Sequence, residues 1–175
     1  MANTYTLISS NTLTSSAASV TFSSIPATYT DLVLKFSART NQATSSSYCR
    51  ITFNGASSGY SETYIQGDGS AASSGLFANR AYFGVNNTIY LPGSSNTANT
   101  FGYSELYLPS YLASQNKPVS IYSATENNNA TAYEALTAGL FSDTTAISSI
   151  TLLARDGTSS FISGSSFYLY GIKST

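Results

Sequence analysis

The feature that most constrains the fold of this chain is an alternation of apolar and polar side chains with a period of two. In Asp31–Arg39 the apolar side chains occupy every second position, as Leu32, Leu34, Phe36 and Ala38. Successive side chains of a strand point to opposite faces, so this pattern predicts a strand that buries one face. Similar segments recur at Tyr5–Ser9, Ser19–Ile25, Tyr48–Asn54, Ser61–Gln66, Arg80–Val85, Thr88–Leu91, Thr100–Leu108, Val119–Thr125, Ala132–Phe141, Ile147–Arg155 and Ser165–Ile172.

Turn-forming residues separate these segments. Asn54-Gly55, Gly67-Asp68-Gly69 and Asp156-Gly157 offer the positive φ angles that hairpin turns require. Ala132–Leu140 contains helix-favouring residues, but polar loops flank it, and we expect it to be a strand. The stretches expected to be polar loops are Thr40–Ser47, Ser70–Gly75, Gly93–Asn99 and Glu126–Thr131. Many short strands with regular turns predict an all-β sandwich or barrel.

The length of 175 residues is enough for one domain with a substantial core. Apolar residues two positions apart fix which face of each strand is inside. The side chains expected to fill the core are Leu32, Leu34, Phe36, Leu106, Leu108, Val119, Ile121, Ile150, Leu152, Phe167 and Leu169.

The composition excludes several classes of site. Without histidine, the chain cannot build a Ser-His-Asp or Cys-His nucleophile or a His-based metal site. One cysteine cannot form an intramolecular disulfide or a zinc cluster. Seven basic residues are too few for a nucleic-acid surface, and no apolar run is long enough to span a membrane. The first residues lack the features of a secretory signal, and we expect no cofactor, no metal and no nucleic-acid or membrane partner.

Only 9% of the residues are charged, against about 25% in an average domain. Hydroxyl and amide groups must therefore cover much of the surface, and such a surface repels its neighbours weakly. The content of 42% hydrophobic and 13% aromatic residues is too high for a disordered polar chain. This composition favours a folded protein that tolerates crowded neighbours.

The carboxylates do not form a recognisable catalytic pair. Glycoside hydrolysis needs two carboxyl groups across a cleft, and nothing in the spacing of the acidic residues singles out two. Asp68 and Asp156 precede glycines, which is typical of turn residues and lacks the further acids of a calcium loop. Glu105 alternates with core leucines and is expected to face outward. We expect no enzymatic activity. The acidic residues considered are Glu62, Asp68, Glu105, Glu126, Glu134, Asp143 and Asp156.

Three other residues have an ordinary interpretation. Cys49 lies in a predicted strand, and it is expected to be an inert, buried thiol, because Arg50 points to the opposite face. Lys35 and Arg39 share a strand face, which predicts solvated side chains or an ion pair between subunits.

The tyrosines leave three interpretations open. Some must lie on an outward sheet face, where they could pack across strands, form a subunit interface or stack on a sugar. The tyrosines that alternate with apolar or small residues are Tyr60, Tyr64, Tyr82, Tyr103, Tyr107, Tyr111 and Tyr122.

The N-terminal segment, residues 1–17, precedes the main unit, residues 18–175. A short apolar strand here is followed by a polar, low-complexity stretch. It is either the first strand of the chain's own sheet or an arm that adds to the sheet edge of a neighbour. As an arm it would contact its partner through Tyr5, Leu7 and Ile8.

Several stretches, taken together and in order, resemble a family of virion structural proteins of tailed bacteriophages. They are Ser24–Thr40, Arg50–Tyr60, Thr100–Pro109, Lys117–Asn127, Gly139–Leu152 and Ser165–Lys173. The resemblance implies a two-sheet, jelly-roll-like β-sandwich, commonly assembled as a homotrimer on the virion. Members are capsid decoration (cement) proteins or modules of tail fibres and baseplates. The family carries no catalytic motif that could be transferred to this chain.

The sequence therefore predicts a single-domain, all-β, jelly-roll-like sandwich. The expected function is that of a capsid decoration protein on the outer head surface, where it would stabilise contacts between major capsid subunits. The alternative is a tail-fibre or baseplate module that binds a host surface glycan.

Overall fold

The computed structural model describes residues 5–85, 88–126, 128 and 132–173. These residues form no α-helix, and every regular element is a β-strand. The strands are β1 (Tyr5–Thr12), β2 (Ser19–Phe22), β3 (Asp31–Ala38), β4 (Ser46–Phe53), β5 (Tyr60–Gly67), β6 (Ala72–Arg80), β7 (Tyr90–Pro92), β8 (Gly102–Leu108), β9 (Lys117–Ala124), β10 (Glu134–Phe141), β11 (Ile150–Ala154) and β12 (Ser166–Ile172).

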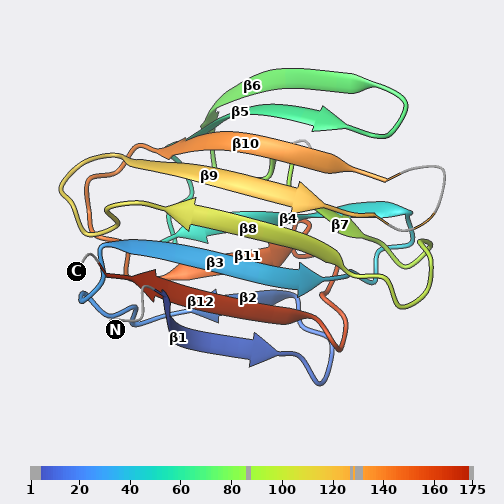
Figure 1. Cartoon of the computed structure of the whole chain (residues 1–175), viewed down its shortest axis with the longest axis horizontal. Coiled ribbons are helices and arrows are strands. Elements are labelled where there is room, and N and C mark those ends of the chain that lie inside the picture. Colours follow the sequence, from blue (N-terminus) through green and yellow to red (C-terminus); the bar gives the residue numbers. More distant parts are fainter. Residues whose placement is uncertain (1–4, 86–87, 127, 129–131, 174–175) are drawn as a thin grey trace.

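The strands form two antiparallel sheets that pack against each other (Figure 1). The larger sheet has eight strands in the order β1-β12-β3-β8-β9-β10-β5-β6, and the smaller has four in the order β2-β11-β4-β7. The core lies between the two sheets. The predicted all-β, two-sheet sandwich is confirmed.

The strand order follows the logic of a jelly roll. The pairs β1–β12, β2–β11, β3–β8 and β4–β7 are those of one long hairpin, and they alternate between the two sheets as the hairpin rolls up. Two hairpins are inserted into this roll, one containing β5 and β6 and the other β9 and β10. Both inserted hairpins join the larger sheet beyond β8, so this sheet extends past the eight-stranded roll.

All the predicted core residues are buried, each with at most 5% of its surface exposed. A second, aromatic part of the core lies where the inserted strands join the roll. There the ring of Phe53 is 5.6 Å from that of Phe83 and 5.7 Å from that of Phe141. The ring of Tyr60 stacks on Phe141 at 4.7 Å, and its hydroxyl accepts a 2.8 Å hydrogen bond from the Phe53 N–H. Burial raises the pKa of Tyr60 to about 12.

Two local predictions were wrong, and both concern β6. The predicted loop Ser70–Gly75 contains the start of β6, because pairing with β5 outweighs the weak strand preference of serine, alanine and glycine. The predicted strand Arg80–Val85 is not formed: Arg80 ends β6 and pairs with Tyr60, and of the residues that follow it to Val85 only Phe83 bridges to another strand, at Ile51. In contrast, Ala132–Phe141 does contain a strand, β10.

The N-terminal segment pairs within its own chain. β1 runs antiparallel to β12 and forms one edge of the larger sheet. A bulge interrupts the register between Leu7 and Ser9, and the intervening Ile8 packs against the chain's own core. Tyr5 and Leu7 remain 53% and 50% exposed. Residues 1–4 of this segment and most of the predicted loop 126–131 lie outside the described residues.

Candidate interaction surface

The outer face of the larger sheet, which points away from the smaller sheet, carries the large apolar side chains that remain exposed. The strand registers place them all on this face, because each is aligned with outward positions of its neighbours. Large exposed apolar side chains that share one face make that face a candidate interaction surface. We call this set the apolar face: Tyr5, Leu7, Ile65, Leu76, Tyr103, Tyr107 and Leu136, each 37–70% exposed.

One pair of opposite charges on the same side of the sheet forms an ion pair. Lys35 and Glu105 are cross-strand partners whose Nζ and Oε2 atoms are 3.0 Å apart, and the Tyr103 hydroxyl donates a 2.8 Å hydrogen bond to Glu105. The hydrogen bond to Glu105 raises the pKa of Lys35. Partial burial opposes ionisation of Glu105, but hydrogen bonds from Tyr103 and Lys35 lower its pKa. The middle of this surface thus carries a closed ion pair and no net charge.

The opposite side of the molecule has a different chemistry. On the smaller sheet the hydroxyls of Thr21 and Thr151 are hydrogen bonded across strands at 3.0 Å. The guanidinium of Arg50 lies 4.1 Å from the ring centre of Tyr82, a cation–π contact. This surface is rich in hydroxyl groups, so the two outer faces of the sandwich are not equivalent.

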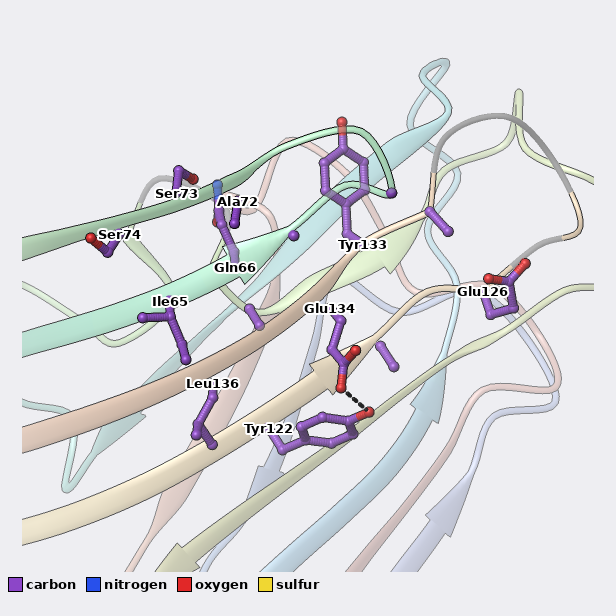
Figure 2. Close-up of a pocket in the computed structure, with 15 residues that line it drawn as sticks. Ile65, Gln66, Ala72, Ser73, Ser74, Tyr122, Glu126, Tyr133, Glu134 and Leu136 are labelled. Carbon is purple, nitrogen blue, oxygen red and sulfur yellow. Dashed lines mark hydrogen bonds between the residues drawn. The ribbon is translucent and has the colours of Figure 1, made fainter.

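A groove of about 990 Å³ opens where the inserted strands end (Figure 2). The Tyr122 hydroxyl donates a 3.0 Å hydrogen bond to Glu134, and this bond raises the pKa of Tyr122. The ring of Tyr133 stacks on Tyr90 at 4.2 Å with an angle of 9°. The Tyr90 hydroxyl donates in turn to Gln66 at 3.1 Å, and burial raises the pKa of Tyr90 to about 12.

The groove has the composition of a site for an uncharged, polyhydroxylated ligand. Its aromatic rings offer faces for stacking, its amide and carboxylate oxygens accept hydrogen bonds, and none of the described residues that line it is a lysine or arginine. It borders the apolar face through two aliphatic side chains. The main lining side chains are Ile65, Gln66, Tyr122, Glu126, Tyr133, Glu134 and Leu136.

The predicted turn roles of Asp68 and Asp156 and the predicted burial of Cys49 are confirmed. Asp68 and Asp156 organise turns, accepting hydrogen bonds from the N–H groups of Ser70 and Thr158. Cys49 is completely buried, and burial raises the pKa of its thiol. Among the described residues, no three His, Cys, Asp or Glu side chains are close enough together to hold a metal ion.

The prediction of solvated side chains for the basic pair is wrong for Arg39 and holds for Lys35, whose side chain is 39% exposed. Lys35 forms its ion pair within the chain, and Arg39 lies beyond the end of β3 with only 6% of its surface exposed. The Arg39 guanidinium donates to backbone carbonyls of the 94–100 loop, including Asn96 at 2.9 Å. β3 ends at Ala38, so Arg39 does not follow the alternation of the strand, and its side chain does not share the outward face of Lys35.

The tyrosines singled out from the sequence lie in several environments, with Tyr122 in the groove and Tyr82 against Arg50. Tyr60, Tyr64 and Tyr111 are buried, whereas Tyr103 and Tyr107 belong to the apolar face. The alternation pattern could have revealed the aliphatic members of this face, since Ile65 and Leu136 occupy outward positions of their strands. Leu76 had no such signal because its strand was not predicted.

Glu62 is a further residue that the sequence did not single out. It is 3% exposed and accepts hydrogen bonds from the Gly84 N–H and the Thr88 hydroxyl, both at 3.0 Å. Burial raises its pKa, although these two hydrogen bonds act in the opposite direction. Glu62 therefore anchors the segment that follows β6 beneath the inserted strands.

The fold and surface define a jelly-roll β-sandwich with one apolar outer face. No protein-family model matches the chain, and neither curated proteins nor solved structures include a match. No helix in the described part of the chain is long and apolar enough to cross a membrane.

Proposed function

We propose that this chain is a structural protein of a phage virion, a capsid decoration protein that acts as a homotrimer on the outer head surface. The observation that carries the proposal is the apolar face, because the large exposed apolar side chains of the described residues are gathered on one side of one sheet. The resemblance to virion proteins of tailed phages is the reason for proposing a homotrimer on a phage head. The proposal includes no catalytic role.

The apolar face would hold the protein against major capsid subunits by burial. Full burial of a large apolar side chain is worth about 1.5–3 kcal/mol, so completing the burial of half-exposed side chains contributes roughly 1 kcal/mol each. Seven of them together approach the ~4–15 kcal/mol that association costs. One contact is therefore weak, and several contacts made by one trimer on a repeating shell would give stable binding. Binding to the assembled shell alone stabilises the shell by mass action.

The test compares shell binding by variants of the two outer faces. Tyr107→Ser combined with Leu136→Ser removes two members of the apolar face, and Leu153→Ser is the control on the outward side of the smaller sheet. In co-sedimentation with empty capsids, the double variant is expected to lose binding and the control to keep it. Equal binding by both, or virion density that places the chain only on the tail, would reject the proposal.

A tail-fibre or baseplate module that binds a host glycan is the second candidate, and the groove favours it. Tyr122, Tyr133 and Glu134 combine stacking rings with a hydrogen-bond acceptor, a combination that suits a neutral sugar. This candidate predicts a glycan-array signal that Tyr133→Ala abolishes and that Tyr168→Ala, on the distant strand β12, retains. An array without any signal would reject it.

A further inference from the structure

β6 is a free edge of the larger sheet. Figure 1 shows β6 and β1 at opposite margins of this sheet. β6 has nine residues and pairs with β5 on one side only. The backbone N–H and C=O groups on its other side are therefore available to a further strand.

The other three sheet edges have features that oppose pairing. β2 has four residues, and β7 has three and ends in Pro92. β1 is long, but the bulge between Leu7 and Ser9 interrupts it near its middle. Short strands, prolines and bulges are the usual means of protecting an edge.

β6 has none of these features over most of its length. Its register with β5 is regular from Ala72 to Phe77, and the irregularity occurs only near Arg80. No charged residue and no proline occurs between Ala72 and Asn79, and the first four residues have small side chains. Leu76, which at 70% is the most exposed large apolar side chain of the described residues, belongs to this strand.

We propose that β6 pairs antiparallel with β6 of a second copy of this chain, around a twofold axis. Antiparallel pairing of identical strands satisfies both edges with the same hydrogen bonds, which fits a second copy. It also brings the start of each β6 beside the end of the other. Asp68 lies in the turn before the strand and Arg80 at its end, so opposite charges meet twice, once at each end of the contact.

The resulting dimer has one continuous sheet in which each copy contributes eight strands. Leu76 of each copy then lies beside the partner's edge and loses exposed surface. The twofold contact is separate from the threefold contact of the proposed trimer and does not depend on it. If both form, the β6 contact links neighbouring trimers.

The test changes the charges at the two ends of the proposed contact. Sedimentation velocity of the full chain over a range of concentrations then gives the mass in solution. The wild-type protein is expected to reach even multiples of 18.4 kDa. Arg80→Glu places like charges together at both ends and is expected to weaken the twofold association roughly tenfold. Adding Asp68→Asn to Arg80→Glu removes the like-charge repulsion at both ends, while the asparagine Oδ1 can still accept the turn hydrogen bond from the Ser70 N–H, and this double variant is expected to restore the mass.

A second pair of variants tests the edge itself. Leu76→Lys places a charge on β6, and Thr63→Lys places the same charge on the residue directly opposite in β5, one strand away from the edge. Leu76→Lys is expected to halve the mass in solution, and Thr63→Lys is expected to leave it unchanged. Any one of three results would overturn the proposal. These are a wild-type mass that is no even multiple of 18.4 kDa, a second substitution at Asp68 that does not restore the mass lost in Arg80→Glu, and equal masses of Leu76→Lys and Thr63→Lys. Asp68 and Arg80 lie outside the apolar face, so loss of shell binding by Tyr107→Ser with Leu136→Ser reports on the proposed function separately.

Discussion

Arg39 is expected to be one of the most sensitive single positions of the fold. Its guanidinium donates hydrogen bonds to the carbonyl oxygens of Ser94, Asn96, Thr97 and Thr100 and to the Thr100 hydroxyl. The only salt bridge among the described residues joins Lys35 and Glu105, so carbonyl dipoles stabilise the charge of Arg39. Replacing it by methionine keeps most of the volume and removes every donor.

The expected loss is smaller than the number of bonds suggests. Hydrogen bonds to a charged group are worth about 1.5–3 kcal/mol each, and five of them would sum to about 8–15 kcal/mol, as much as the entire ~5–15 kcal/mol that stabilises a typical domain. The loop residues Ser94 and Thr97 are exposed, however, and water can replace the lost donor. Asn96 is buried and its carbonyl cannot be satisfied in that way. We therefore expect Arg39→Met to lower the free energy of unfolding by about 3 kcal/mol.

The measurement is urea unfolding followed by fluorescence or circular dichroism. With a dependence on urea of about 2 kcal/mol/M, a loss of 3 kcal/mol moves the midpoint by roughly 1.5 M. Arg39→Lys keeps the charge with fewer donors in a different geometry, and it is expected to lose about half as much. A urea midpoint for Arg39→Met within about 0.3 M of the wild type, or a larger loss of unfolding free energy for Arg39→Lys than for Arg39→Met, would refute the idea that the hydrogen bonds from Arg39 to the loop carbonyls stabilise the fold.

Two further predictions concern buried polar groups. The Thr137 hydroxyl is buried and has no hydrogen-bond partner among the described residues, so Thr137→Val should raise the free energy of unfolding by about 1 kcal/mol, and a lower urea midpoint would contradict this. The pKa of Glu62 is raised in the folded state, so its ionisation costs stability as the pH rises above its unfolded value. The free energy of unfolding of Glu62→Gln, measured with urea and taken relative to the wild type, should therefore be higher at pH 7 than at pH 4. The same difference between variant and wild type at both pH values would exclude this linkage.

The period-two pattern predicted the inner faces of the strands correctly. Leu32, Leu34 and Phe36 are buried, as are Leu106 and Leu108, because an alternating strand can bury its apolar face only by pointing it at a second layer. The pattern failed for β6, whose sequence ASSGLFANR has little preference for a strand. Hydrogen bonding to β5 stabilises the extended conformation of β6, for which its own sequence has little preference.

The candidate surface was less predictable than the core. Outward tyrosines were expected, and so was an uncharged, hydroxyl-rich surface. Which strands are neighbours was not visible, so Ile65, Leu76 and Leu136, from three different strands, could not be placed together. The register joins them, since Leu136 pairs with Ile65, and Thr63, two residues before Ile65, pairs with Leu76.

The alternation of side chains was enough to predict an all-β chain with a defined inner face, because this alternation is a local property of an extended backbone. The tertiary structure alone decided which face stays uncovered. The inserted hairpins, β5–β6 and β9–β10, add to one sheet only. Among the described residues, no second layer covers the apolar side chains on the outside of that sheet, and its outermost strand, β6, pairs on one side only. Both features arise from contacts between residues far apart in sequence, which no local pattern contains.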